Sequence, residues 1–183
     1  MSYLIAAPVP IIAGFAAAWA CPMKPDSGAD VPFRPPAIVF RIVWPVLYIM
    51  MGLAWAFALR NAGRSTGLKA LVCIVHLLLT ALLCSWLYFY ACRDKRSWAL
   101  LVLLFAQVVS FVATVVGPGL TPRLLLLPLQ IWLLFATMLN VYQISSCTAN
   151  PFSQVYQDVR RTVDNLGAHF QRLGVPAEAD AAV

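Results

Sequence analysis

The residues with the clearest potential for chemistry are aromatic, and the first group of them follows a proline-rich stretch. Residues 32–36 read Pro-Phe-Arg-Pro-Pro and precede Trp44 and Tyr48. Because prolines fix φ and remove backbone donors, residues 32–36 predict a stiff, non-helical lid. Trp44 and Tyr48 are four residues apart and therefore share one face of a helix. Together these residues predict a surface on which a flat apolar molecule can stack, with Arg34 available for a carboxylate.

A second aromatic group lies in residues 128–140, which carry Trp132, Phe135 and Asn140. Each ring, taken alone, is better explained by packing in a hydrophobic core than by ligand binding. Prediction of a binding pocket therefore rests on the combination of rings with a few polar groups. The predicted ligand-binding residues are Phe33, Arg34, Trp44, Tyr48, Trp86, Trp132, Phe135 and Asn140, to which the family resemblance described below adds Pro35, Pro36 and Thr137.

Motifs for metal or cofactor chemistry are absent from the sequence. It has no P-loop, no GxGxxG, no HExxH and no Cys and His pairs at metal-ligand spacing, so no cofactor or metal is predicted. The two histidines are His76 and His169. His76 lies inside an apolar run, where it is either a functional group or a neutral imidazole bonded to a neighbouring helix.

The five cysteines form no CxxC pair, and most of them lie within or at the ends of apolar runs. In that setting a free thiol behaves as a small hydrophobic side chain, so the pattern predicts free cysteines and no disulfide framework. The redox compartment stays open.

Composition identifies the surroundings in which these residues work. Of 183 residues, 62% are hydrophobic and only 11% are charged, whereas soluble domains have about 25% charged residues. This excludes a soluble globular enzyme and a disordered chain. The net charge of +6 comes from basic residues in short connections, which is typical of membrane topology signals and not of nucleic-acid binding.

Five apolar segments are long enough for helices that span a membrane, which needs roughly 20 residues each. The sequence thus predicts an all-α, polytopic bundle of five transmembrane helices in residues 1–148. The expected helices cover residues 4–20, 37–59, 68–91, 98–116 and 124–144. Pro45 is expected to kink the second of them or to open its backbone locally.

Five spans place the two termini on opposite sides of the membrane. Nine of the 13 basic residues then share the side of the C-terminus, so the positive-inside rule predicts a cytoplasmic C-terminus. In the tail, residues 149–183, apolar side chains recur every three or four residues and predict an amphipathic helix at about residues 151–173. The nine basic residues are Lys24, Arg34, Arg41, Arg93, Lys95, Arg96, Arg160, Arg161 and Arg172.

Two of these stretches resemble the translocator proteins, the family also called TspO or peripheral benzodiazepine receptor proteins. After the proline-rich lid, the family pattern of helix two is matched by Val39-Phe40, Val43-Trp44, Leu47-Tyr48 and Met51-Gly52. The helix-five pattern is matched by Pro128, Trp132, Phe135, Thr137 and Asn140. The helix-three pattern is only partly present, with Trp86 and Arg93 kept, and the lid tryptophan of the family is Phe33 here.

The resemblance implies a membrane receptor whose pocket binds tetrapyrroles such as protoporphyrin IX or haem, and flat drug-like ligands. It could transport them or regulate tetrapyrrole and stress metabolism. A second interpretation is a porphyrin-degrading enzyme, driven by light or an oxidant, in which Trp44 and Trp132 are the redox-active side chains. A third is a structural membrane protein that acts through partners.

The partners that the sequence predicts are an apolar ligand and the lipid bilayer. Small residues at helix spacing, such as Gly14 and Gly52, fit either a homodimer or packing within the bundle. Sterol binding stays open, since only a weak Leu83, Tyr88, Arg93 pattern supports it. By resemblance, the membrane is the mitochondrial outer membrane in a eukaryote and the cell envelope in a bacterium.

Overall fold

The computed structural model describes residues 5–24 and 31–148. The chain divides into a unit of residues 1–144 and a second unit of residues 145–183. All contacts discussed below lie within the first unit. The amphipathic helix predicted at residues 151–173 lies outside the described residues.

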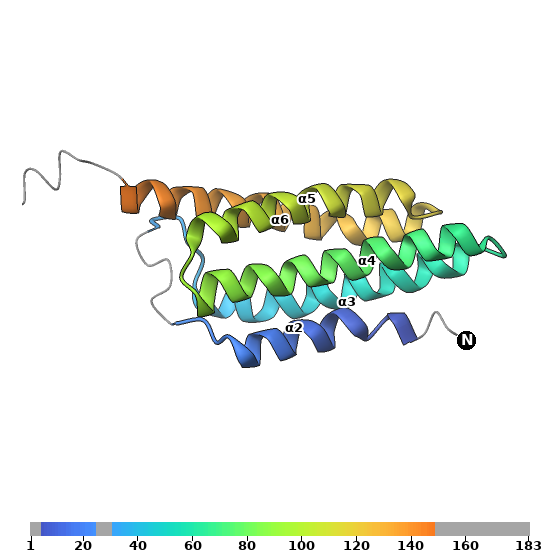
Figure 1. The fold of residues 1–183 in the computed structure, drawn as a ribbon, viewed down its shortest axis with the longest axis horizontal. Helices are drawn as coiled ribbons and strands as arrows, with labels where there is room; N and C mark the ends of the chain where they lie inside the picture. Colours follow the sequence, from blue (N-terminus) through green and yellow to red (C-terminus); the bar gives the residue numbers. More distant parts are fainter. Residues whose placement is uncertain (1–4, 25–30, 149–183) are drawn as a thin grey trace, which may run out of the picture. The chain divides into compact units, whose positions relative to one another are not determined.

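The described part of the chain consists of helices joined by short non-helical connections and contains no strand (Figure 1). The α4 helix continues into a short π-helix, η1, before the chain turns into α5. The elements are α2 (Val9–Ala20), α3 (Ala37–Asn61), α4 (Thr66–Leu87), η1 (Tyr88–Cys92), α5 (Arg96–Val116) and α6 (Leu120–Thr148).

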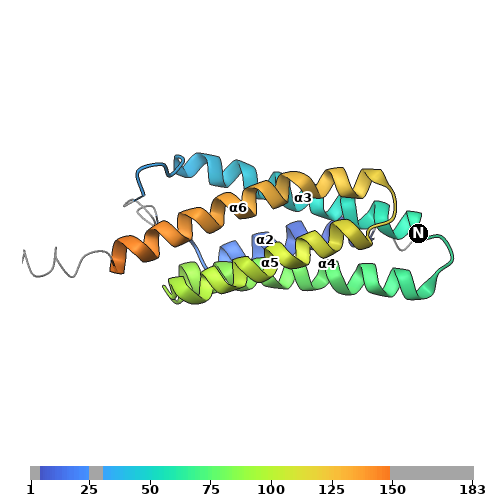
Figure 2. The same cartoon turned by 90° about the horizontal axis from the view of Figure 1, so that it is seen from above.

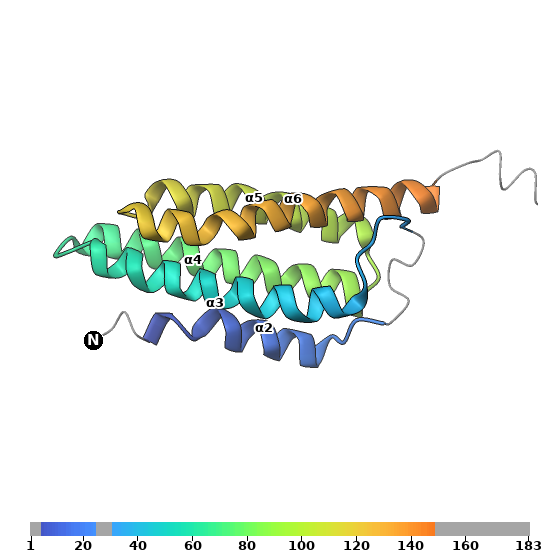
Figure 3. The ribbon, with the colours of Figure 1, turned by 180° about the vertical axis from the view of Figure 1, so that it is seen from behind.

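Within the first unit the helices form layers. Helices α5 and α6 make one layer, α3 and α4 a second, and α2 lies on the outer side of α3 and α4 (Figures 1 and 3). Seen from above, α3 and α4 separate toward the end where α3 begins and α4 ends (Figure 2). Residues at the start of α3 and at the end of α4 line a cavity at that end of the unit.

The prediction of an all-α membrane protein is confirmed, because four described helices are long and apolar enough to cross a membrane. They are α3, α4 with η1, α5 and α6. The described α2 starts at Val9, later than the predicted residue 4, and has 12 residues. At 1.5 Å per residue it spans about 18 Å, less than the hydrocarbon core. Pro8 at the N-cap and Pro10 at the start of α2 explain the late start, since proline supplies no backbone donor.

The inner face of each long helix is a narrow stripe of buried side chains. In α5 it consists of Ala99, Leu103, Ala106, Ser110 and Ala113, which recur at spacings of three and four. The outer face of α5 is exposed and apolar, as expected for a surface that contacts lipid. The buried stripe of α6 has the same spacing over Pro122, Leu126, Leu129, Leu133, Ala136, Asn140 and Gln143, and Leu139 is buried as well. Its last two members are polar, and they lie at the end of the unit that holds the cavity.

Two glycines let α2 approach α3 closely. A Cβ atom on Gly52 would collide with the backbone carbonyl of Ala7, and one on Gly14 would collide with the ring of Tyr48. Both glycines therefore serve packing within the bundle. Of the two roles that the sequence allowed at these positions, homodimer contact or packing within the bundle, the structure shows the second. A homodimer through other surfaces stays a prediction.

The lid and Pro45 determine how α3 enters the unit. Residues 31–36 are non-helical. The amide of Arg34 donates to the carbonyl of Val31 at 3.1 Å, and the amide of Val39 donates to the carbonyl of Pro36 at 2.9 Å. Pro36 is the N-cap of α3 in an extended conformation. Helix α3 runs through Pro45 without ending. The lid therefore ends at Pro36, and α3 begins at the next residue with no further connection between them.

Candidate functional site

A cavity of about 440 Å³ lies at the end of the unit where α2 and η1 end and α3 begins. This volume is within the range of small-molecule sites. Residues of α2 and the segment after it form one wall, and the start of α3 forms another. The ends of α4 and η1 and the buried stripe of α6 complete the cavity.

Four aromatic rings follow one another along the cavity. Trp44 is central: its ring is stacked on Tyr48, with centroids 5.7 Å apart, and on Trp86 at 5.2 Å. Trp86 is stacked in turn on Tyr90 at 5.4 Å. All four residues line the cavity. A planar apolar ligand would therefore meet a continuous aromatic wall that is already assembled.

Buried polar atoms in the cavity wall lack hydrogen-bond partners within the described residues. The indole N–H groups of Trp44 and Trp86 have none, and neither do the side-chain oxygens of Asn140 and Gln143. The amide nitrogens of these two residues are used, since Asn140 donates to Ala136 and Gln143 to the Tyr90 hydroxyl. An unpaired buried polar group costs about 1–3 kcal/mol. These four atoms are covered by neighbouring groups, so a heteroatom-containing ligand can reach them only when side chains of the wall move.

The charged residues of the cavity wall are all basic. Lys24, Arg34 and Arg41 line the cavity, and no acidic residue does so among the residues described. The guanidinium of Arg34 lies 5.7 Å from the ring centroid of Phe40, which places it over an aromatic face. The cavity is thus apolar and aromatic in its wall and cationic in part of its lining, which suits a flat ligand that carries carboxylates.

This arrangement can be compared with known proteins. The family model described as the TspO/MBR family matches residues 5–145, which is well over half of the chain. The chain belongs to the TspO/MBR family. No curated protein matches the sequence. The match covers the four long helices, α2 and the complete cavity wall of this TspO/MBR protein.

Of the predicted site residues, five line the cavity of this TspO/MBR protein: Arg34, Trp44, Tyr48, Trp86 and Asn140. The other six lie outside the wall, and two of these form a layer behind it. Trp132 contacts Trp44 edge to face at 6.3 Å, and Phe135 packs on Trp132 at 5.4 Å.

The remaining four predicted residues have other contacts. Phe33 packs against Tyr142 at 5.4 Å, and Thr137 donates a hydrogen bond to Leu133 within its own helix. Pro35 and Pro36 belong to the lid and the start of α3. The lid residues Phe33, Pro35 and Pro36 therefore place Arg34 at the wall and do not line the wall themselves.

Sequence reasoning missed several lining residues, above all Tyr90, Gln143, Lys24 and Arg41. Gln143 follows Asn140 by three residues and so lies on the same face of α6, a signal that could have identified it. Tyr90 belongs to η1, where a π-helical turn changes the direction in which side chains point. Helical periodicity does not predict that change.

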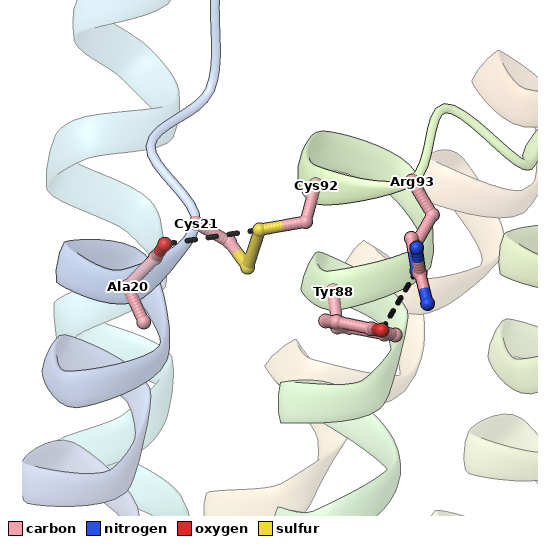
Figure 4. Close-up of a disulfide and its surroundings, with 5 residues drawn as sticks. All are labelled: Ala20, Cys21, Tyr88, Cys92 and Arg93. Atoms are coloured by element: carbon pink, nitrogen blue, oxygen red, sulfur yellow. Dashed lines mark hydrogen bonds between the residues drawn. A yellow bond between two sulfur atoms is a disulfide. The ribbon is translucent and has the colours of Figure 1, made fainter.

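Contrary to the expectation of free cysteines, Cys21 and Cys92 form a disulfide (Figure 4). It joins the residue that ends α2 to the last residue of η1, 71 positions later. The spacing of the cysteines in the sequence does not predict a disulfide. However, Cys21 and Cys92 each follow a predicted span, and these two spans end on the same side of the membrane. That shared location could have identified the two cysteines as a possible pair. The Cys92 sulfur lies 3.7 Å from the Ala20 carbonyl oxygen. This is a van der Waals contact and not a hydrogen bond, because a disulfide sulfur carries no hydrogen.

His76 lies apart from the cavity wall in this TspO/MBR protein. Its Nδ1 is 2.9 Å from the carbonyl of Val72 in its own helix, and its ring is stacked on Trp55 of α3 at 5.6 Å. The Nδ1 atom therefore donates, and the imidazole is held by its own helix and an aromatic neighbour. No group of three or more His, Cys, Asp or Glu side chains that could hold a metal occurs in the described residues.

Proposed function

We propose that this TspO/MBR protein is a membrane receptor for tetrapyrroles with free carboxylates, such as protoporphyrin IX. The observation that carries the proposal is the stacked series Tyr48, Trp44, Trp86 and Tyr90 along one cavity. A porphyrin presents a large planar π-face, and a cavity lined by several aromatic rings favours a ligand of that kind.

The charges of the wall support a ligand with acidic groups. The propionates of a tetrapyrrole would be bound by Arg34, Arg41 or Lys24, because charge-assisted hydrogen bonds are stronger than neutral ones. The unpaired indole and amide atoms of Trp44, Trp86, Asn140 and Gln143 would bind its polar atoms. Transport of the bound ligand would require this same site, and so would a regulatory role in tetrapyrrole metabolism.

The experiment is a titration of the protein in lipid nanodiscs with protoporphyrin IX in the dark. We expect saturable quenching of tryptophan emission, because three tryptophans lie in or directly behind the cavity wall. Empty nanodiscs are the control for partition into lipid. Quenching that rises linearly with porphyrin and equals the empty-disc signal would contradict the proposal.

A second candidate is light- or oxidant-dependent porphyrin degradation. The observation that favours it is the edge-to-face contact of Trp44 with Trp132 at 6.3 Å, which joins an indole of the wall to one behind it. Illumination of the bound complex should then bleach the porphyrin absorbance, and Trp44→Phe or Trp132→Phe should abolish bleaching with most of the affinity kept. Unchanged absorbance under light would exclude this activity and leave the receptor.

A further inference from the structure

The Cys21–Cys92 disulfide lies in the wall of the cavity and not in a remote part of the unit. Cys21 lines the cavity, and so do Pro22, Met23 and Lys24, which follow it. On the other side of the bond, Leu87 and Tyr90 from the end of α4 and from η1 also line it. The disulfide therefore ties two walls of the cavity to each other (Figure 4).

The middle of α2 and the residues just before it are held by packing instead, including Gly14, which also lines the cavity. Gly14 lies against Tyr48, Ala7 lies against Gly52, and the Cys84 thiol donates to the carbonyl of Ala13 at 3.6 Å. These contacts do not depend on the disulfide. Breaking the disulfide would thus leave the first part of α2 in place and release the end that borders the cavity.

The two sulfurs differ in their access to a reductant. Cys21 is 7% exposed, whereas Cys92 is exposed at the end of η1. A thiolate can therefore attack the Cys92 sulfur, with Cys21 leaving as the thiolate. A second reductant thiol then releases Cys92. In total the bridge gains two electrons and two protons, and two reductant thiols become one disulfide.

The charge pattern places this bond on the side where such reductants occur. Lys24, Arg34 and Arg41 lie at the same end of the unit as Cys21, and so do Arg93 and Lys95 next to Cys92. The positive-inside rule predicts that this end faces the cytoplasm. Disulfides of cytoplasmic thiols are rare because glutathione and thioredoxin reduce them, and those found are commonly regulatory. A bond at this position is therefore conditional on the redox state.

From these observations we propose that Cys21–Cys92 is a redox latch on the cavity, an inference that rests on the proposed tetrapyrrole-binding function. When the bond is formed, the α2 wall is fixed to η1 and a bound ligand exchanges slowly. When a thiol reductant opens the bond, the wall at residues 21–24 moves away and the ligand exchanges faster.

The test is the dissociation rate of protoporphyrin IX from the full-length protein in nanodiscs, oxidised or treated with dithiothreitol. We expect reduction to accelerate dissociation about tenfold and to change the equilibrium affinity less, because a latch acts on entry and exit together. The double variant Cys21→Ser/Cys92→Ser should dissociate as fast as the reduced protein and ignore the reductant. The matched control, Cys73→Ser/Cys147→Ser, keeps both the bridge and the Cys84 contact with α2, and it should retain the full response.

Hydrogen exchange of the protein without ligand separates failure of the latch from failure of the receptor. The amide of Cys21 donates to Ala17 at 2.8 Å, and its exchange should accelerate on reduction. If no porphyrin binds in either redox state, the receptor proposal fails. Hydrogen exchange of the Cys21 amide is then the measurement that tests the latch. Equal dissociation rates in both states, unchanged exchange at Cys21, or a response that persists in the Cys21→Ser/Cys92→Ser variant would overturn the latch.

Discussion

Arg34 is the basic residue whose position most directly links the lid to the cavity. Its amide donates to the carbonyl of Val31 within the non-helical lid, and its guanidinium lies over Phe40 at the start of α3. The backbone of the lid and the aromatic ring together limit where this charge can go. A guanidinium held in this way loses less conformational freedom when it binds a carboxylate.

We predict that Arg34→Gln weakens binding of protoporphyrin IX about tenfold, since hydrogen bonds to charged groups contribute about 1.5–3 kcal/mol. The dimethyl ester of protoporphyrin lacks the carboxylates, so its affinity should change little. Arg93→Gln is the matched control, because Arg93 lies at the same end of the unit but contacts Tyr88 and does not line the cavity. Equal losses for the acid and the ester in equilibrium titrations would argue against a carboxylate contact.

Gly52 is the residue whose replacement should most disturb the attachment of α2. We predict that Gly52→Ala lowers the free energy of unfolding by about 1–3 kcal/mol, because the added Cβ would collide with the backbone of Ala7. Gly67→Ala adds the same atom where nothing lies within 4 Å, so it should cause no loss. Thermal unfolding in detergent compares the two variants, and equal stabilities would contradict this close packing.

At the scale of elements, polar side chains join helices that apolar packing alone would leave free to slide. Gln130 of α6 donates to the Thr114 hydroxyl of α5 at 2.7 Å and to the Ser110 carbonyl at 3.4 Å. Gln143 joins α6 to η1 through the Tyr90 hydroxyl at 3.0 Å. Because lipid is as apolar as the helix surfaces, such bonds help to determine how helices associate.

Removal of the α5–α6 link should therefore destabilise the first unit. We predict that Gln130→Leu lowers the free energy of unfolding by about 0.6 kcal/mol, the average for interhelical hydrogen bonds in membranes, and by no more than about 1.7 kcal/mol, the largest value. Thr137→Val is the control, because the Thr137 hydroxyl bonds only to Leu133 of its own helix among the described partners. Unfolding in mixed detergents measures both, and a larger loss for Thr137→Val would refute the role given to Gln130.

The helices themselves were largely predictable from sequence, and their ends were not. Apolar length alone located α3 to α6, since a run such as residues 98–116 has few other stable conformations in lipid. The start of α2 at Val9 depends on Pro8 and Pro10, which interrupt an otherwise apolar run. The conversion of α4 to η1 at Tyr88 depends on local hydrogen bonding that composition does not encode.

The candidate site was predictable to the extent that residues share a helical face. Trp44 and Tyr48 are four residues apart, and both line the cavity. Trp132 and Phe135 were assigned to the wall because they match the family's helix-five motif, but they do not line the cavity, and Trp132 contacts the wall residue Trp44. Which ring is in front depends on the rotation of α6 against α3, a tertiary property that the spacing of residues within one helix cannot supply.

At the scale of the whole molecule, the charges at the two ends of the first unit determine its expected orientation. Lys24, Arg34, Arg41, Arg93 and Lys95 mark the end with the cavity. The opposite end has the basic residues Arg60, Arg64, Lys69 and Arg123. The basic tail residues predicted on the cavity side increase the difference, so the cavity should open toward the cytoplasm together with the C-terminus.

We predict that a cysteine at Ser97 is protected from a membrane-impermeant maleimide applied from the non-cytoplasmic side, whereas a cysteine at Thr66 is labelled. Both residues are exposed, and they lie at opposite ends of the unit. The labelling is done in sealed cells or vesicles, with permeabilised membranes as the control in which both positions react. Labelling of Ser97→Cys and protection of Thr66→Cys would show the reverse orientation.

The central claim is that one aromatic wall, centred on Trp44, binds a flat ligand, and two buried tryptophans provide its most direct test. Trp44 and Trp55 are 8% and 4% exposed, but only Trp44 lines the cavity. The measurement is the dissociation constant of protoporphyrin IX, followed by porphyrin absorbance, for Trp44→Leu and Trp55→Leu in nanodiscs. We predict a loss of about tenfold or more, or about 1.4 kcal/mol, for Trp44→Leu and little change for Trp55→Leu. Equal affinities for the two variants would contradict the assignment of this wall as the binding site.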